Sequence, residues 1–206
     1  MDSSKLAVKF FFQDGTAPHS EAVVPVFHRW IQTHAVPEHQ LVDVADYQHV
    51  VGGPGTVLVA HEANVSTDQS ENQPGLIYIR KTPLAGDLPQ RLLKVFGYAL
   101  QVCKLLEDEP SLQPKAKFRT DNPIIRIYDR LKAPNTTETF NALRFALTTV
   151  AQQLFGASAQ LSHLPGEKTL FQVRITASAN DSITSVLSRM EKAPPVAYSE
   201  PPEYSL

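Results

Sequence analysis

The sequence has little cysteine and little net charge, and these scarcities limit the classes of protein to which it can belong. Cys103 is the only cysteine among 206 residues, so an intrachain disulfide cannot form. A lone cysteine favours a reducing compartment. The N-terminal stretch, with an acidic second residue and an apolar run that stops at Phe12, does not resemble a secretory signal. We therefore expect a cytoplasmic protein.

Two further absences argue against nucleic-acid and membrane partners. The formal net charge is −2, whereas proteins that grip nucleic-acid phosphates generally carry a strong positive field. No apolar run approaches the ~20 residues that a membrane-spanning helix needs. Hydrophobic residues make up 42% of the chain, which is typical of a globular protein. We expect a soluble protein that binds neither nucleic acid nor membrane.

Hydrophobic periodicity predicts strands and helices in the first half of the chain. Alternating apolar residues indicate a strand at 5–12, and a helical pattern covers 22–33, with Ser20 as its N-cap. Further strands are expected at three places, residues 41–45, 56–65 and 76–81. A long amphipathic helix is predicted at 88–107, where Asp87 is suited to cap its first turn and Pro110 follows its end.

The second half repeats these kinds of element. Two strands are predicted at 115–119 and 123–128. A helix with Asn135 as N-cap and Glu138 three residues later is predicted to end at Gly156. A strand pair, 160–164 with 170–177, and a helix at 181–192 follow. The fold class is therefore α+β, with a mixed or antiparallel sheet packed by helices. We expect one compact domain over 1–192 and an extended proline-rich tail over 193–206.

The order of elements suggests a more specific alternative. A strand, a helix, strands and a helix occur first in residues 1–110 and again in 111–192. When the sequence is shifted by 116 residues, apolar helix positions such as Phe27 and Leu143 coincide. This pattern favours two ferredoxin-like βαββα halves, although unrelated amphipathic helices often align equally well.

The glycine-rich stretch at 52–55, Gly-Gly-Pro-Gly, is the first candidate for a site. A phosphate loop needs backbone N–H groups at a helix N-terminus, and neither nucleotide-binding glycine pattern is present. The following residues read as a strand. Pro54 and Gly55 are suited to the centre of a type II turn. We interpret the stretch as a connector between two strands.

Potential metal ligands surround this connector. Asp43, His49 and His61 could meet across a hairpin and hold a divalent transition metal. His61 and Glu62 are the only candidates for catalytic residues. In a regular strand their side chains would point to opposite faces, so the two could not chelate one ion. The alternative is that these are a packed histidine with a hydrogen-bonded neighbour and solvated carboxylates, with no metal or other cofactor.

A positively charged strand is the second candidate site. Lys115, Lys117 and Arg119 alternate with Ala116 and Phe118, which would place three cations on one strand face and allow an anionic ligand to bind. The alternative is a solvated edge whose charges prevent sheet-to-sheet association. Cys103 lies on the apolar stripe of a helix, where a thiol is normally inert packing.

These patterns encode an architecture more clearly than a reaction. The favoured hypothesis is an α+β module that binds a small molecule or a protein partner without catalysis, and a homodimer is left open. The competing hypothesis is a metal-assisted hydrolase or related enzyme that uses His61, His49 and Asp43.

Overall fold

The computed structural model describes residues 5–166 and 169–192, so the tail predicted at 193–206 lies outside the described residues. The α-helices of the described part are α1 (Ser20–Thr33), α2 (Leu88–Glu107), α3 (Thr137–Phe155) and α4 (Ile183–Lys192), and a short 3-10 helix, η1, lies at Ser70–Asn72. The strands are β1 (Leu6–Phe12), β2 (Leu41–Asp46), β3 (Thr56–Ala60), β4 (Ala63–Asp68), β5 (Gly75–Arg80), β6 (Phe118–Ile127), β7 (Gln160–His163) and β8 (Phe171–Thr176).

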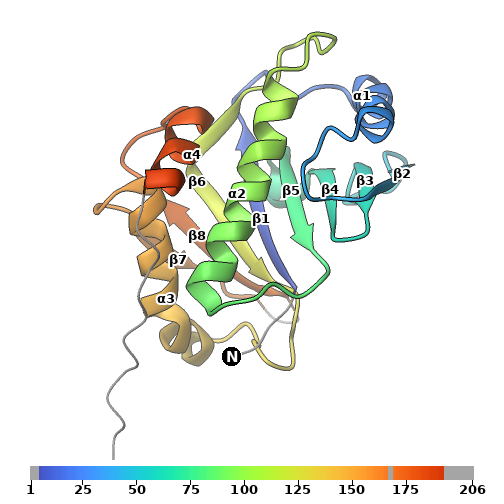
Figure 1. Cartoon of the computed structure of the whole chain (residues 1–206). Helices are drawn as coiled ribbons and strands as arrows, with labels where there is room; N and C mark the ends of the chain where they lie inside the picture. Colours follow the sequence, from blue (N-terminus) through green and yellow to red (C-terminus); the bar gives the residue numbers. More distant parts are fainter. Residues whose placement is uncertain (1–4, 167–168, 193–206) are drawn as a thin grey trace, which may run out of the picture.

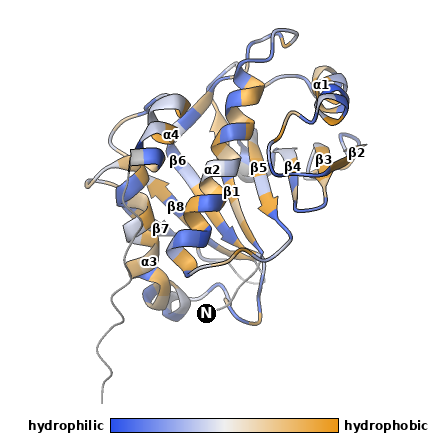
Figure 2. Cartoon of the chain, viewed as in Figure 1, coloured by the Kyte–Doolittle hydropathy of each residue, from blue (hydrophilic) through white to orange (hydrophobic). Residues whose placement is uncertain are grey.

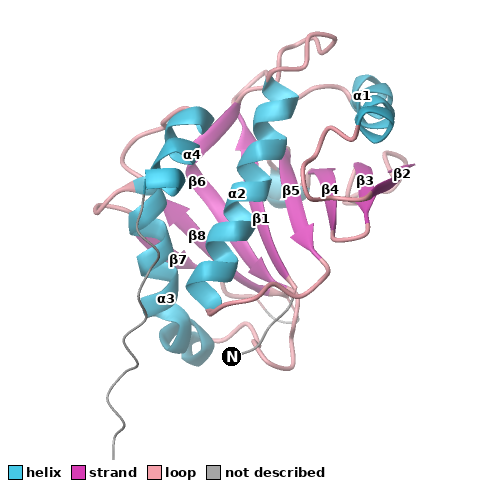
Figure 3. Cartoon of the chain, viewed as in Figure 1, coloured by secondary structure: helices cyan, strands magenta, loops and turns pink. Residues whose placement is uncertain are grey.

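The eight strands form one antiparallel sheet in the order β2-β3-β4-β5-β1-β6-β8-β7 (Figure 1). The α-helices cover one face of this sheet, with α2 lying across its middle strands (Figure 3). The predicted α+β class, with an antiparallel sheet packed by helices, is confirmed. No helix of the described residues is long and apolar enough to cross a membrane.

The hydrophobic core lies between the helices and the sheet. Alternate residues of β1, namely Leu6, Val8, Phe10 and Phe12, belong to this core. Helix α2 presents a buried apolar stripe that includes Phe96 and Cys103, and it alternates between hydrophilic and hydrophobic segments as it crosses the sheet (Figure 2). Burial raises the pKa of the Cys103 thiol well above its usual value, so this cysteine is packing material as predicted.

The two long helices begin at capped ends, one of which differs from the prediction. At α2 the Asp87 side chain accepts a hydrogen bond from Gln90 N at 2.9 Å, and the Gln90 side chain accepts one from Asp87 N at 3.1 Å. At α3 the N-cap is Thr136, not Asn135, because the Thr136 hydroxyl accepts from Thr139 N. Asn135 instead uses its side chain to bind the β7–β8 region, where it donates to Thr169 Oγ1 at 2.7 Å.

The prediction of one continuous strand at 56–65 is also wrong, because the chain turns back in the middle of this range. It consists of β3 and β4, which pair with each other around a turn at His61 and Glu62. The two strands predicted at 115–119 and 123–128 are also corrected: one continuous strand, β6, covers 118–127, residues 115–117 lie in a loop, and the pairing of β6 with β1 contains a register shift. The Gly-Gly-Pro-Gly connector lies between β2 and β3 as predicted, and Gly55 has a φ of +69°.

The central strands relate the two halves of the chain. β1 and β6 lie side by side, with β5 and β4 beyond β1 and with β8 and β7 beyond β6. The second half has the element order βαββα, whereas the first half contains the additional hairpin of β2 and β3. The two ferredoxin-like halves therefore stay a prediction, with an element order that fits only the second half directly.

The face of the sheet opposite the α-helices, which we call the helix-free face, contains a fully buried lysine. Lys9 in β1 is 0% exposed. Its ammonium lies 2.7 Å from Asp68 Oδ2, and it donates to Ser70 O at 2.7 Å and to Gln73 O at 3.1 Å. A Cβ on Gly75 would lie 2.4 Å from the backbone oxygen of Phe10 and 2.9 Å from Lys9 Cε, so this position requires glycine and the lysine passes beside it. Lys9 thereby fixes η1 and its flanking residues against the helix-free face.

The carboxylate partner of Lys9 titrates abnormally. Burial alone would raise the pKa of Asp68, but hydrogen bonds from Lys9 and Ser70, together with the charges of Lys9 and Arg126, hold this pKa below its usual value. The ionised carboxylate is therefore the form that the fold stabilises.

We expect Lys9→Met to lower the free energy of unfolding by about 3 kcal/mol, because it leaves a buried carboxylate without its closest cation. Urea unfolding at pH 7 measures this change. The matched control is Lys104→Met, which breaks an exposed pair with Asp108 on α2 and should cost less than about 0.5 kcal/mol. Equal stabilities for the two variants would contradict a structural role for the buried ammonium.

Acid should remove the contribution of Asp68. Its pKa is lower in the folded chain than the ~3.9 of an unfolded aspartate, so its stabilisation is complete above about pH 4 and is lost as the pH falls through the folded value. The difference in unfolding free energy between the wild type and Asp68→Asn should be largest at neutral pH and should shrink below about pH 4. Urea titrations at several pH values test this expectation, which a constant difference would refute.

Candidate functional site

His61 and Glu62, the catalytic candidates, form the turn between β3 and β4. The His61 side chain is exposed, and its backbone N–H donates to Gln40 O at 2.9 Å. The Glu62 carboxylate accepts from Gln40 N at 2.8 Å. Burial would raise the pKa of Glu62, but this backbone hydrogen bond and the nearby His39 and His61 lower it. These contacts connect the turn to the segment that precedes β2.

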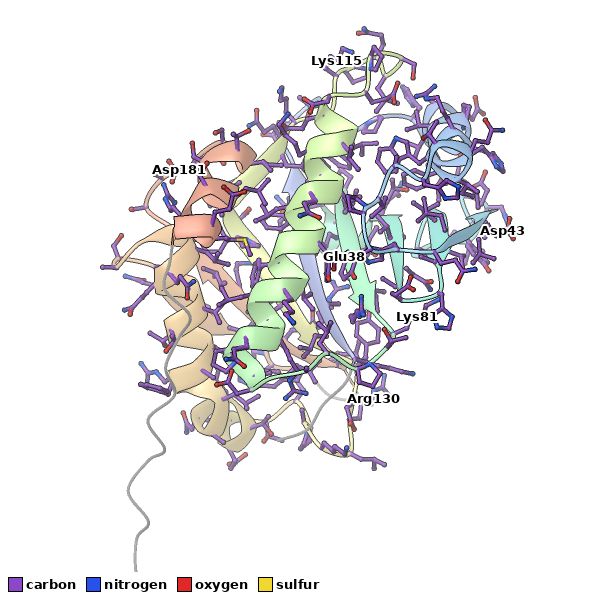
Figure 4. The ribbon with its side chains drawn as sticks, viewed as in Figure 1. Glu38, Asp43, Lys81, Lys115, Arg130 and Asp181 are labelled. Atoms are coloured by element: carbon purple, nitrogen blue, oxygen red, sulfur yellow. The ribbon has the colours of Figure 1, made fainter. Side chains whose placement is uncertain are left out.

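The structure does not assemble the predicted metal ligands. Asp43 lies on β2 at the outer edge of the sheet, where its carboxylate accepts from Val44 N at 2.8 Å (Figure 4). His49 lies in the loop after β2, which ends at Asp46, so it does not share a strand face with Asp43. Within the described ranges, no group of three or more His, Cys, Asp or Glu side chains is placed to hold a metal ion.

The predicted cationic strand is divided between a loop and a strand. Only Arg119 belongs to β6, and it forms two hydrogen bonds with the Asp121 carboxylate, at 3.1 and 2.9 Å. Lys115 lies in the loop beyond the end of α2 and donates to Glu109 O at 2.8 Å (Figure 4). Lys117 lies 3.5 Å from Glu107 Oε2. Each of the three cations therefore already has an acceptor within the chain.

A buried polar and aromatic cluster lies beside α2, and no sequence motif predicted it. His39 Nδ1 lies 2.7 Å from Pro37 O, and His39 Nε2 lies 2.7 Å from the Tyr78 hydroxyl. Because a carbonyl oxygen only accepts, Nδ1 of His39 carries a proton, and in the tautomer with that single proton Nε2 accepts from the Tyr78 hydroxyl. Burial raises the pKa of Tyr78 to about 12, although Arg80 favours the phenolate. Tyr78 is therefore a neutral hydrogen-bond donor.

The outer part of the same cluster reaches the surface. The Tyr98 hydroxyl donates to Glu38 Oε2 at 2.6 Å, and the Arg80 guanidinium lies 5.6 Å from the centre of the Tyr98 ring. Glu38 has a φ of +59°, a region that residues other than glycine rarely adopt. Tyr78 and His39 are too deeply buried for a substrate to touch. The cluster is best explained as a clasp that holds the segment before β2 against β5 and α2.

A hollow of about 270 Å³ lies on the helix-free face. Its floor consists of two cross-strand rows, because strand partners share a face of the sheet. One row runs through Ala45, Val57 and Ser66, and the next through Val59, Asn64 and Ile79. Tyr47 and Pro54, from either end of the β2–β3 connection, complete the walls. The rows come from β2, β3, β4 and β5, so a rigid sheet shapes the hollow.

Two polar side chains face this otherwise apolar hollow from β4. Asn64 is half-buried, and its Oδ1 is buried without a hydrogen-bond partner. Ser66, two residues along the same face, is 2% exposed. The only sequence signal for them is weak: β4 is rich in polar residues, with Asn64, Ser66, Thr67 and Asp68 among its six positions. A buried polar atom without a hydrogen-bond partner, such as Asn64 Oδ1, needs an explanation, and a bound ligand is one.

A second hollow, of about 560 Å³, lies near the start of α1. Its walls include His19, Gln48, Gln69 and Asn72, all of which are exposed. Ligand sites generally combine a mostly apolar lining with a few placed polar groups. The smaller hollow on the helix-free face fits that description better, although its volume is lower.

Fold and site together define an α+β protein with a helical layer on one side of its sheet and a small neutral hollow on the other. No family model matches the chain. No curated protein matches it closely enough to be counted as a relative.

The cluster beside α2 yields a stability prediction. Tyr78→Phe leaves His39 Nε2 buried without a donor and should lower the unfolding free energy by about 1–3 kcal/mol. Tyr47→Phe removes a hydroxyl from an exposed tyrosine and should change it by less than about 0.5 kcal/mol. Thermal and urea unfolding of both variants measure the difference. If Tyr78→Phe is as stable as Tyr47→Phe, the clasp does not exist as described.

Proposed function

We propose that this protein is a binding module that holds a small molecule in the hollow on the helix-free face and performs no chemistry on it. The observation that carries this proposal is the pair of cross-strand rows. They place apolar side chains and two polar groups around one space of about 270 Å³. That volume is about nine times the ~30 Å³ that a water molecule occupies in the liquid, so the space suits a small organic molecule.

The rigidity of the floor supports binding. Val57 and Val59 lie in β3, a strand paired on both sides, and Ile79 lies in β5, which is also paired on both sides. Sites built on strands hold their geometry more precisely than sites built on loops. A ligand would therefore meet a largely preformed surface and would order few side chains on binding.

The composition of the walls supports binding without catalysis. General acid–base and nucleophilic mechanisms use a histidine, carboxylate, thiol, lysine or activated hydroxyl within reach of the substrate. Among the eight residues that line the hollow, Tyr47 is the only one with a titratable side chain, and Ser66 has no histidine beside it in the lining. The same lining offers no ligand set for a transition metal.

Filling the hollow should abolish binding. A screen of small neutral compounds, monitored through the amide and methyl signals of the protein, should yield compounds that shift Val57, Val59 and Ile79. Val59→Trp, which places an indole into the hollow, should remove these shifts and weaken binding at least tenfold. Val42→Trp is the matched control, because Val42 is 60% exposed on β2 and lies outside the lining. Its ligand shifts should equal those of the wild type.

Other outcomes of the same experiments would contradict the proposed function. Compounds that shift other regions only, or that bind Val59→Trp as tightly as the wild type, would place the site elsewhere. Turnover of a bound compound that is lost in Val59→Trp would contradict the absence of catalysis. Thermal unfolding of both tryptophan variants confirms that each is folded before binding is compared.

A further inference from the structure

The hollow on the helix-free face also indicates the chemical class of its ligand, an inference that rests on the proposed function. We propose that the ligand is an uncharged molecule with a flat, mostly apolar body and one amide-like edge, which both donates and accepts a hydrogen bond. A lactam fused to an aromatic ring is the simplest molecule of this class. Three observations support the proposal: the lining carries no charge, Asn64 has an unpaired side-chain oxygen, and the floor places polar side chains between apolar ones.

The walls favour a neutral ligand. None of the eight lining residues carries a formal charge at pH 7, and the aliphatic residues Ala45, Val57, Val59 and Ile79 dominate the floor. An ion placed there would lose its hydration without gaining a counter-ion, which is strongly unfavourable. The carboxylate of Asp43, whose cross-strand partner is the lining residue Val59, lies on the same sheet face and would further disfavour an anion.

The side-chain oxygen of Asn64 lacks a hydrogen-bond donor, and the amide-like edge of a ligand would supply one. Its Oδ1 is buried and accepts no hydrogen bond. A side-chain amide has an acceptor and two donors on one planar group. A ligand with adjacent N–H and C=O groups can satisfy both kinds at once, after a rotation of the Asn64 amide that brings its edge into the hollow. A ligand with only an N–H or only a C=O group would leave either the acceptor or the donors of the Asn64 amide without a partner.

The floor fixes how such a ligand would lie. Val59 and Ile79 are the cross-strand neighbours of Asn64, on either side of it, and Val57 is the neighbour of Ser66. The polar groups therefore form a short line along β4, with apolar side chains on both sides. A flat molecule can direct its polar edge to this line while its ring lies over the valines. Tyr47 at the wall offers an aromatic surface for the same ring.

Isoquinolin-1-one, its N-methyl derivative and 1-naphthoate test the proposal as probes of nearly equal size. The lactam should bind about tenfold more tightly than the N-methyl derivative, which lacks the N–H donor, and more tightly than the anionic naphthoate. Asn64→Val should bring the affinities of the lactam and its N-methyl derivative within about twofold. Valine suits a strand position between Val59 and Ile79, so this variant should fold.

Asn122→Val is the matched control for that substitution. Asn122 also has a buried Oδ1 without a hydrogen-bond partner, but it does not line the hollow. Its variant should keep the full preference for the lactam. Titration calorimetry gives the affinities, and the protein signals of Val57 and Ile79 confirm the location. Loss of the preference in Asn122→Val as well would show that Asn64 is not its source.

The remaining outcomes separate this inference from the proposed function. A preference that persists in Asn64→Val arises from the size of the N-methyl group, and it overturns the amide edge. Equal binding of all three probes in the hollow also overturns the ligand class but supports the site. If neither lactam binds while other neutral compounds still shift Val59, the ligand class alone fails. If no compound binds in the hollow, the proposed function fails with it.

Discussion

The helix-free face is organised by the ion pair between Lys9 and Asp68. β1 is buried along its whole length, so a lysine at its centre must find its partners inside the protein. The partners are the carboxylate of Asp68 and two carbonyl groups, that of Ser70 at the start of η1 and that of Gln73 just after η1. The segment between β4 and β5 must therefore fold back across the sheet, and Gly75 provides the space in which the lysine passes.

This ion pair also separates the charged and neutral parts of one sheet face. Lys9 and Arg126 lie on the neighbouring strands β1 and β6, and Asp68 approaches both of them from the end of β4. Farther along β4, the same face carries Ser66 and Asn64 and then meets the valines of β3. The hollow lies in this neutral part, where an uncharged molecule would contact no formal charge.

Local patterns predicted most of the fold, while the contacts between distant residues decided the site. The bounds of α2 and its Asp87 cap followed from periodicity and capping preferences. The turn at His61 and Glu62 did not, because it has no glycine, proline or asparagine, and the apolar alternation continues through it. The Thr136 cap was missed because Asn135 satisfies the same preference. The hollow requires the register of four strands, which no single segment contains.

The central claim is that the neutral rows on the helix-free face are a ligand site. A crystal structure of the protein with isoquinolin-1-one tests it most directly. The account predicts the ring over Val57 and Val59, with the lactam edge paired to the Asn64 amide. Density for the molecule in the exposed hollow near His19 and Asn72, with the space beside Asn64 filled only by water, would contradict it.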